Sequence, residues 1–293
     1  MTLAVDIGGT KMAAGIVDRD GSLLVHEQRP TPARGEGTAM FGVLADLVEV
    51  VRARARDDHG VDAEVCGVGC GGPMALGGET VSPLNIEAWR EFPLRRELAT
   101  ASGLSVFVDN DAKALALGEG WRGAAAGCAD FLAMVVSTGV GGGIVLDGRL
   151  LDGAAGNAGH IGHVNVEPDG RECVCGAVGC LEAEASGTAI AAITGAPAKD
   201  AGPEVVRRTG RLVGRAVASV ANLLDLRLAV VAGSVALGFG APFFAAAQDE
   251  IDRQAHLDFS TGTRILPGGL GPEGPLVGAA AVARAGLGLP VVG

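Results

Sequence analysis

Three cysteines and a histidine are crowded into a short part of the chain, in the order H-x9-C-x-C-x4-C: His163, Cys173, Cys175 and Cys180. Structural zinc takes four nitrogen or sulfur ligands in a tetrahedron, and three thiolates with one imidazole complete such a set. Gly176 and Gly179 would let the chain turn tightly enough to bring the thiolates together. The alternative is three core cysteines beside a surface histidine, but this crowding among only six cysteines favours structural zinc.

Two glycine-rich segments could close on phosphate oxygens. They are Asp6-Ile7-Gly8-Gly9-Thr10-Lys11 and Ser137-Thr138-Gly139-Val140-Gly141-Gly142-Gly143. Glycines let backbone N–H groups approach a phosphate, Thr10 adds a hydroxyl donor, and Asp6 could hold Mg²⁺ through water. An ordinary hairpin turn explains either segment alone. Because the two segments follow equivalent strands, together they favour one polyphosphate site.

Two better-known phosphate motifs do not fit this chain. The Walker motif needs Gly-Lys followed by Ser or Thr, and the sequence contains no Gly-Lys pair. Residues 67–72 (GVGCGG) match G-x-G-x-x-G, but Pro73 follows at once and no helix is expected to open there. No second strand ends in an acidic residue at the required distance, so a Rossmann dinucleotide site is not expected.

A third polar group, Asp109-Asn110-Asp111, lies between an expected strand and an Ala-rich helix. An aspartate in this position is often only the N-cap of the helix. It could also be a general base, because α/β proteins place ligands at the carboxyl ends of their strands. Both interpretations stay open from the residues alone.

The spacing of apolar residues predicts alternating strands and helices. Strands are expected at 3–7, 12–17, 22–28, 64–70 and 105–109, and helices at 38–57, 94–102 and 112–120. From residue 131 a similar series begins again: strands at 131–137, 144–150 and 228–233, a glycine turn at 139–143 and a helix at 203–224. This α/β pattern with its weak duplication predicts two similar lobes.

Composition narrows the class of ligand. The 293 residues carry a net charge of −11 and include 48 glycines, eight phenylalanines, two tryptophans and no tyrosine. Such a chain is not suited to general nucleic-acid or anionic-membrane binding, so a small-molecule ligand is expected. Residues 228–247 are uncharged and long enough to span a bilayer, but Gly233, Gly238, Gly240 and Pro242 divide them. Without a leader pattern, we expect a cytoplasmic protein.

Together these motifs resemble the repressor–open reading frame–kinase (ROK) family of sugar kinases and related regulators. The resemblance runs along essentially the whole chain, through DIGGTK, VDNDAKALALGE, STGVGGG and GHIGHV…CVCGAVGCLEAEASG. It implies an actin/hexokinase-like (ribonuclease H-like) fold of two α/β lobes with a structural zinc loop, ATP in the cleft and a hexose beneath it. The expected small lobe is 1–111, joined by a C-terminal helix at 277–293. The expected large lobe is 112–276, with the zinc loop at 160–182.

The resemblance also implies roles for individual residues. Asp111 matches the catalytic base, and His163 matches a residue that both ligates zinc and touches the sugar. The positions implied to bind the sugar are Asn85, Asn110, Asp111, His160, His163 and Glu182. Those implied to bind ATP are Asp6, Gly8, Gly9, Thr10, Lys11, Thr138, Gly139, Gly233 and Ser234, the last two on the nucleoside side.

One departure from the family pattern concerns the choice of sugar. Most kinases of the family have Gly-Glu-x-Gly-His where this chain has Gly159-His160-Ile161-Gly162-His163. An imidazole therefore replaces a sugar-contacting carboxylate. The same histidine is similar to that of bacterial N-acetylmannosamine kinases, so both glucose and N-acetylmannosamine stay open as substrates.

The function implied is ATP-dependent phosphorylation of the C6 hydroxyl of a hexose or N-acylhexosamine, with Mg²⁺ and structural Zn²⁺. A homodimer is expected from the resemblance alone. Repressors of the family carry a helix-turn-helix domain before the first phosphate turn, whereas only five residues precede Asp6. The alternative is a non-catalytic sugar-sensing regulator without a DNA-binding domain, which predicts a missing base, but Asp111 is present.

Overall fold

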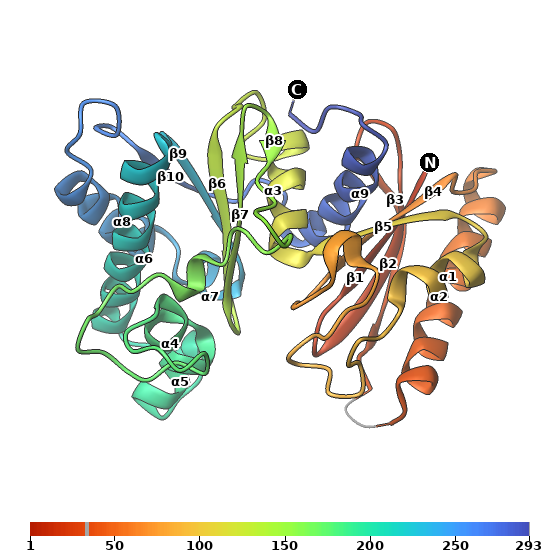
Figure 1. Ribbon diagram of the computed structural model, residues 1–293, viewed down its shortest axis with the longest axis horizontal. Helices are drawn as coiled ribbons and strands as arrows, with labels where there is room; N and C mark the ends of the chain where they lie inside the picture. The colour runs from red at the N-terminus through yellow and green to blue at the C-terminus, as the bar shows by residue number, and fades with distance from the viewer. Residues whose placement is uncertain (33–34, 293) are drawn as a thin grey trace. The chain divides into compact units, whose positions relative to one another are not determined.

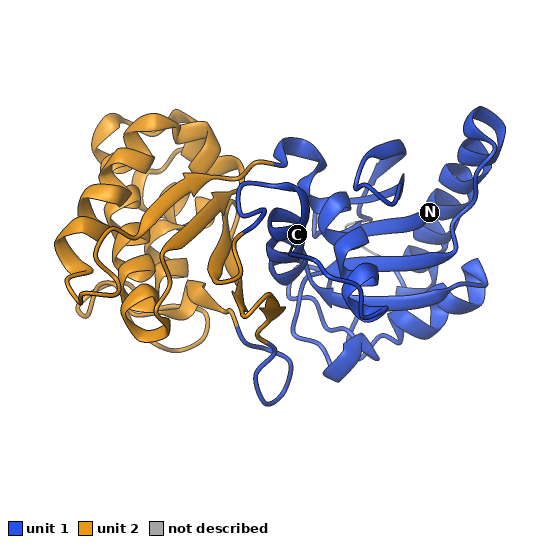
Figure 2. Cartoon of the chain, turned by 90° about the horizontal axis from the view of Figure 1, so that it is seen from above, with its two compact units in different colours: residues 1–127, 152–158, 270–293 blue, residues 128–151, 159–269 orange. Residues whose placement is uncertain are grey.

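The computed structural model describes residues 1–32 and 35–292, which form two compact units (Figure 2). The first unit comprises Met1–Gly127, Asp152–Ala158 and Leu270–Gly293, and the second comprises Cys128–Leu151 and Gly159–Gly269. The chain therefore passes from one unit to the other at 127/128, 151/152, 158/159 and 269/270. Each unit has a five-stranded sheet and a hydrophobic core of its own.

The sheet of the first unit has the strand order β3-β2-β1-β4-β5. β1, β2 and β3 pair antiparallel as a meander, whereas β4 and β5 add to β1 in parallel. The strands are β1 (Thr2–Ile7), β2 (Lys11–Val17), β3 (Leu23–Pro30), β4 (Val65–Cys70) and β5 (Ser105–Asn110). The carboxyl ends of β1, β4 and β5 consequently lie at one edge of this sheet.

Helices cover both faces of this sheet, and the residues beneath them differ in size. Figure 1 shows α1 and α2 on one side and α3 and α9 on the other. Leu3, Val5 and Ile7 belong to the core beneath α1, whereas Ala4 packs with α9. Side chains alternate along a strand, so Asp6 lies on the same face as Ala4. The helices are α1 (Gly37–His59), α2 (Leu94–Ser102), α3 (Asp111–Arg122) and α9 (Gly274–Gly286).

Small residues let α9 lie directly on the strands. A Cβ added to Gly67 of β4 would be 2.0 Å from the carbonyl oxygen of Ala279, and one added to Gly118 of α3 would be 2.9 Å from Cα of Gly278. Neither glycine can carry a side chain without moving the helix, because real Cβ contacts are longer than this. The face of the sheet that carries Asp6 is therefore closed by backbone packing.

The second unit repeats the connectivity of the first. Its sheet has the order β10-β9-β6-β7-β8, in which β6, β7 and β8 are antiparallel and β9 and β10 add to β6 in parallel. β6 thus corresponds to β1, which confirms the predicted duplication. The strands are β6 (Phe131–Val136), β7 (Val140–Leu146), β8 (Arg149–Leu150), β9 (Leu228–Ala232) and β10 (Arg264–Pro267).

Five helices and two short 3₁₀ turns complete the described part of the second unit. The long helices α6 and α8 pack closely, because a Cβ on Gly210 would be 2.4 Å from the carbonyl oxygen of Phe243. The helices are α4 (Leu181–Ala185), α5 (Gly187–Thr194), α6 (Pro203–Leu224), α7 (Ser234–Phe239) and α8 (Ala241–Gln254), and the 3₁₀ turns are η2 (Ile161–His163) and η3 (Ala198–Asp200). The first unit holds η1 (Leu76–Gly78) and η4 (Gly271–Glu273).

Three expected elements differ from those observed. The single strand expected at 144–150 is wrong, because β7 ends at Leu146 and β8 begins at Arg149 and returns antiparallel to β7. The glycine turn expected at 139–143 is wrong, because β7 begins at Val140 and the turn is confined to Ser137–Gly139. Gly142 is needed for close packing rather than for turning: its Cβ would be 2.9 Å from Cγ2 of Ile161. The helix expected at 277–293 ends at Gly286.

Residues 228–247 are divided among β9, α7 and α8, as the glycines predicted. Across residues 1–32 and 35–292, no helix combines the length and the apolar character that crossing a membrane requires. The predicted lobe boundary after residue 111 falls at the start of α3, and in the structure α3 packs with α9 inside the first unit.

Candidate zinc centre and active-site residues

The four predicted zinc ligands meet in the second unit. One ligand atom from each of His163, Cys173, Cys175 and Cys180 lies within 4.8 Å of all the others. The Sγ atoms of Cys175 and Cys180 are 3.7 Å apart, and Nδ1 of His163 is 3.7 Å from Sγ of Cys173. Zn–S bonds of about 2.3 Å at tetrahedral angles place two sulfur atoms about 3.8 Å apart. The donor set and its spacing therefore fit zinc.

Backbone geometry explains why this short segment can gather three thiols. Gly176 and Gly179 have φ values of 87° and 76°, in the left-handed region that other residues avoid. The N–H of Cys173 donates to the carbonyl of Ala177 at 2.7 Å, and the N–H of Gly176 donates back to the carbonyl of Cys173 at 2.8 Å. The N–H of Ala177, together with the neighbouring thiol of Cys173, lowers the pKa of Cys175 to about 7, whereas burial and the other two cysteines raise the pKa of Cys180. Cys175 is therefore the cysteine most readily ionised to the thiolate that binds metal.

The zinc loop also has anchors that the sequence analysis missed. The buried carboxylate of Glu184 accepts hydrogen bonds from the backbone N–H of Arg171 and from the guanidinium of Arg208. Arg215 donates to the carbonyl of Val166 at 2.6 Å. These contacts join the loop to α4 and α6. Metal binding is therefore expected to order residues 172–180 rather than the whole of 160–182.

In the first unit, Asp6 and Asp111 come together across β4. A Cβ on Gly69, which pairs with Asp6, would be 3.7 Å from Oδ1 of Asp6 and 3.6 Å from Cα of Asp111. Burial and the negative charge of Asp111 raise the pKa of Asp6 to about 7, although Lys11 opposes the shift. Two carboxylates placed this closely provide the oxygen ligands that Mg²⁺ prefers.

Asn110, rather than an aspartate, is the N-cap of α3. Its Oδ1 accepts hydrogen bonds from the N–H groups of Ala112 at 3.0 Å and Lys113 at 3.4 Å. This satisfies donors that would otherwise lack a partner at the helix start. Asp111 occupies the first turn of the helix, where the helix dipole stabilises its negative charge. Oδ1 of Asp111 also accepts a hydrogen bond from the N–H of Ala112, at 2.8 Å, but the N-cap position belongs to Asn110. The N-cap interpretation of this segment therefore applies to Asn110, and the general-base interpretation of Asp111 stays a prediction.

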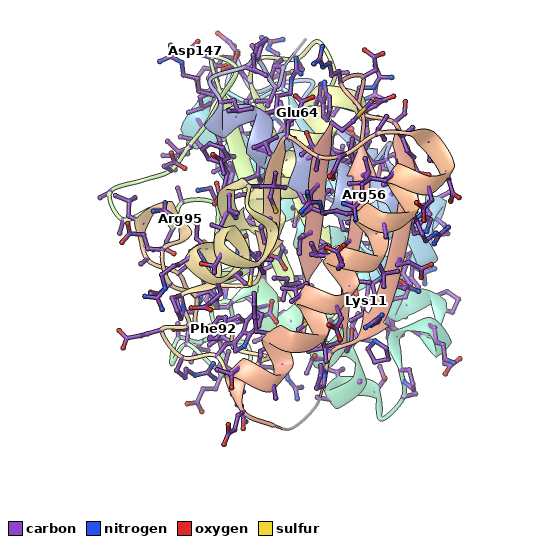
Figure 3. All side chains as sticks on the ribbon, turned by 90° about the vertical axis from the view of Figure 1, so that its right-hand side faces the viewer. Lys11, Arg56, Glu64, Phe92, Arg95 and Asp147 are labelled. Carbon is purple, nitrogen blue, oxygen red and sulfur yellow. The ribbon has the colours of Figure 1, made fainter. Side chains whose placement is uncertain are left out.

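The first glycine turn is a tight hairpin that Asn85 covers. The N–H of Gly8 donates to the carbonyl of Lys11 at 3.0 Å, and the hydroxyl of Thr31 donates to the carbonyl of Gly8 at 2.7 Å. A Cβ on Gly9 would be 2.5 Å from Cβ of Asn85, so these two predicted site residues are in contact. Lys11, labelled in Figure 3, begins β2 and is exposed.

Residues predicted to bind ATP and a residue predicted to bind the sugar lie together at the second glycine turn. The carboxylate of Glu182 accepts a hydrogen bond from the N–H of Val140, and a Cβ on Gly139 would be 3.1 Å from Oε1 of Glu182. Burial raises the pKa of Glu182, although the Val140 N–H and the charge of His163 lower it. The hydroxyls of Ser137 and Ser234 are 2.9 Å apart, so the Gly233-Ser234 pair at the start of α7 lies beside the same turn as Thr138.

The GHIGH segment lies on β7 because its glycines allow close contact. A Cβ on Gly162 would be 2.3 Å from the carbonyl oxygen of Val140, and one on Gly159 would be 2.5 Å from that of Gly142. His160 and His163 are exposed at the two ends of η2, with ring centroids 6.2 Å apart. Since Nδ1 of His163 faces the thiols, its Nε2 is the atom that can meet another ligand.

Sequence reasoning missed a buried lysine next to the predicted base. The Nζ of Lys113 is 3.1 Å from Oδ1 of Asp109 and 2.7 Å from Oδ1 of Asp152. Burial lowers the pKa of Lys113, but the two carboxylates outweigh it and hold the pKa above its ordinary value. The i, i+4 spacing of Asp109 and Lys113 was a visible signal for half of this cluster.

The predicted residues thus fall into two groups. Asp6, Gly8, Gly9, Thr10, Lys11, Asn85, Asn110 and Asp111 belong to the first unit, and Thr138, Gly139, His160, His163, Glu182, Gly233 and Ser234 belong to the second. Within each group the structure brings a glycine turn and predicted sugar contacts together. The G-x-G-x-x-G match at 67–72 lies in β4 and the coil after it, and the next helical element is only the 3₁₀ turn η1.

Comparison with known proteins decides the family. The model of the ROK family matches residues 2–285. The chain belongs to the ROK family. It is 37% identical over 257 residues to the N-acetylmannosamine kinase of Escherichia fergusonii, a match that covers 82% of this chain and 84% of that protein. It is thus a sugar kinase of the family, homologous to N-acetylmannosamine kinases.

Two solved structures agree with this assignment. The ROK hexokinase from Thermus thermophilus matches with a TM-score of 0.85 and 35% identity, covering 98% of this chain and 99% of that one. A ROK family glucokinase from Streptomyces griseus, solved with glucose and AMPPNP, matches with a TM-score of 0.81 and 32% identity, covering 97% and 99% of the two chains. The predicted hexokinase-like fold of two α/β sheets is confirmed.

Zinc content can be tested with one ligand variant and one control. Purified protein should contain about one zinc ion per chain, and Cys173→Ser should contain far less. We expect the variant to lose at least about 2 kcal/mol of stability in urea unfolding, because the metal and the buried thiol are lost together. Cys128→Ser lies outside the cluster and should keep its zinc. A zinc-free wild-type protein with full stability and activity would refute the assignment.

The raised pKa of Asp6 makes a prediction about pH. Between about pH 4 and pH 7 the folded protein keeps a proton on Asp6 that the unfolded chain has released, so stability falls as pH rises. Asp6→Asn removes this penalty. In EDTA, the variant should gain about 1–3 kcal/mol over the wild type between about pH 5 and pH 8 in urea unfolding. The prediction would be contradicted if the difference in unfolding free energy between variant and wild type were the same at the two ends of this pH range. The same gain in the exposed control Asp57→Asn would also contradict it.

Proposed function

We propose that this chain transfers the γ-phosphoryl group of ATP to the C6 hydroxyl of a hexose or N-acylhexosamine. The placement of Asp111 is the observation that carries the proposal. Asp111 lies at the carboxyl edge of the parallel strands β1, β4 and β5, beside Asp6, and the N-cap position of its helix is occupied by Asn110. A carboxylate at that edge of an α/β sheet is suited to accept a proton from a bound ligand.

In the proposed reaction, Asp111 accepts the proton of the C6 hydroxyl as its oxygen attacks the γ-phosphorus. A new P–O bond forms to the sugar, the bond between the γ-phosphorus and its bridging oxygen breaks, and ADP leaves with that oxygen and its electron pair. Positioning and charge stabilisation dominate this chemistry. Asp6 would hold Mg²⁺ through water, and Mg²⁺ would offset charge on the phosphates.

The remaining predicted residues would bind and orient the two substrates. We assign the phosphates to the Gly8–Thr10 and Ser137–Gly139 turns, with Lys11 at the first, and the nucleoside to Gly233 and Ser234. The residues assigned to the sugar are Asn85, Asn110, His160, His163 and Glu182. The expected homodimer belongs to this proposal as well.

The structure supports the assignment of Glu182 and His163 by placing them in one compact arrangement. Glu182 accepts a hydrogen bond from the N–H of Val140, and Nδ1 of His163 is 3.7 Å from Sγ of Cys173, so a bound zinc ion would fix the imidazole ring. An imidazole whose Nδ1 faces a metal presents its Nε2–H as a donor to a ligand. The zinc centre would thus orient a sugar contact without taking part in the chemical step.

Asp111→Asn tests the base directly. The amide keeps the shape of the side chain but does not accept the proton, and loss of a general base typically costs about 10²–10⁴ in rate. We expect a folded variant with near-normal sugar binding and kcat lowered by at least roughly that factor, measured by ADP release. Asp57→Asn serves as the control.

Retention of more than about a third of the wild-type kcat, far outside that range, would show that Asp111 is structural. A wild-type protein that binds sugar but turns over no ATP would instead favour the sugar-sensing regulator.

His160 is the residue we assign to the choice of sugar. A glutamate here would accept hydrogen bonds from two sugar hydroxyls, whereas a neutral imidazole offers one donor and one acceptor. An N-acyl group at C2 supplies a carbonyl that an imidazole N–H can meet and a carboxylate would repel. N-acetylmannosamine is therefore the favoured substrate, with glucose as the alternative. The identity to N-acetylmannosamine kinases supports the same order.

The test compares kcat/KM for glucose and N-acetylmannosamine in the wild type and in His160→Glu. A charge-assisted hydrogen bond is worth about 1.5–3 kcal/mol, so the substitution should shift the ratio toward glucose by roughly tenfold or more. His59→Glu, at the exposed end of α1, is the matched control and should leave the ratio unchanged. An unchanged ratio in His160→Glu would mean that His160 does not contact the sugar at C2.

A further inference from the structure

Lys113 is a buried cation for which the proposed reaction has no use. Its side chain is only 3% exposed, on α3 two residues after Asp111. Its Nζ contacts Asp109 on one side and, on the other, Oδ1 of Asp152 at 2.7 Å and the carbonyl oxygen of Gly156 at 3.2 Å. A lysine is rarely buried this completely, so the contacts must compensate for the loss of hydration.

The segment that Lys113 holds has an unusual place in the chain. Asp152–Ala158 belongs to the first unit, although the residues before and after it belong to the second. The segment closes on itself, because the N–H of Ala158 donates to the carbonyl of Asp152 at 2.9 Å. A cavity of about 270 Å³ lies between it and η1, lined in part by Asp109, Lys113, Asp152 and Gly156. Polar contacts rather than close packing therefore hold this segment.

Two short stretches of chain connect this cluster to the proposed site. Asp111 precedes Lys113 by two residues on the same helix, and His160 follows Ala158 by two residues. Asp109 and Asn110 end β5, so the lysine is also braced against the strand that delivers the base. The cluster thus joins the helix of Asp111 to the segment that leads into His160.

We propose that Lys113 is a positioning residue: by clamping Asp152 and Gly156 to α3, it fixes the segment that leads into His160, the residue assigned to the choice of sugar. This inference rests on the proposed function. Lys113 touches neither substrate, and its effect is on sugar affinity rather than on the chemical step. The side chain of Asp109 is 21% exposed and that of Asp152 is 64% exposed, so the two partners have different tasks. Asp109 holds the lysine in place, and Asp152 is the part of the segment that the lysine captures.

Because Asp152 is exposed, its contact with Lys113 can be removed without disturbing the interior of the protein. Its side chain is 64% exposed, so Asp152→Ala cuts the clamp while leaving the buried pair of Lys113 and Asp109 intact. We expect the sugar KM to rise about three- to tenfold, with kcat changed less than about twofold and the KM for ATP unchanged. Asp57→Ala, an exposed carboxylate on α1, should change none of these values. Hydrogen exchange should become faster at Ala158 and at His163, whose N–H donates to the carbonyl of His160.

A second variant also removes the hydrogen bond from Lys113 to the carbonyl of Gly156. Lys113→Met combined with Asp109→Asn removes the ammonium together with its buried counter-charge, so no uncompensated charge is left inside. It should raise the sugar KM at least as much as Asp152→Ala, and adding Asp152→Ala to it should raise the KM no further. A further rise would mean that Asp152 acts by a route other than Lys113.

The outcomes separate the clamp from the proposed function. An active wild type whose Asp152→Ala variant keeps the same sugar KM overturns the clamp alone. If Asp152→Ala instead lowers kcat and the melting temperature and changes the KM values for both the sugar and ATP, its role is merely structural. That result also overturns the clamp. If the wild type phosphorylates no hexose, the proposed function fails, and calorimetric titration with N-acetylmannosamine and glucose decides the clamp. Equal binding by wild type and Asp152→Ala, or no binding by either, would then overturn it.

Discussion

The proximity of two carboxylates, Asp6 and Asp111, is the constraint on which the arrangement of the first unit depends. Both lie beside the carboxyl edge of its sheet. Asp6 loses hydration on burial and is repelled by the negative charge of the exposed Asp111, and both effects raise the pKa of Asp6. Their proximity follows from two parallel pairings, β1 with β4 and β4 with β5, and from a glycine at the position between them. Such a raised pKa beside a second carboxylate is typical of functional sites, in agreement with the proposed role of these residues. Backbone packing of α9 on the same face keeps the strands from shifting to relieve the repulsion.

Glycine has a different task in the second unit. Gly142 in β7 and Gly159 and Gly162 in the GHIGH segment remove the side chains that would keep η2 away from the sheet. The result is that Glu182, the Ser137–Gly139 turn and the zinc cluster share one small region. Arg208 and Arg215 hold the ends of the same loop on α4 and α6, and a zinc ion bound by the four ligands would hold its centre. The imidazole and carboxylate assigned to the sugar thus stand on rigid supports.

Patterns among residues close together in the sequence predicted the zinc ligands and the strands. They did not predict the contacts between residues that are far apart in the sequence. The spacing of the cysteines indicated a zinc set because all its ligands lie in one loop, and strand periodicity indicated both sheets. Gly141–Gly143 were taken for a turn because a glycine run has the same composition in a turn and in a closely packed strand. The pairs Glu184–Arg208 and Lys113–Asp152 were missed because their partners are 24 and 39 residues apart. Nothing in the sequence near either partner marks such pairs before the fold is known.

The order of segments along the chain has a consequence for synthesis on the ribosome. The second unit lies almost entirely within one stretch, from 128 to 269, apart from the short excursion at 152–158. The first unit needs α9, whose small residues cover the Ala4 face of its sheet, and α9 is made after the whole of the second unit. The half of the protein that is translated first is therefore completed last. Until α9 emerges, only α3 covers this face of the nascent sheet, and its exposed alanine and glycine residues mark the stage at which chaperone binding or misfolding would act.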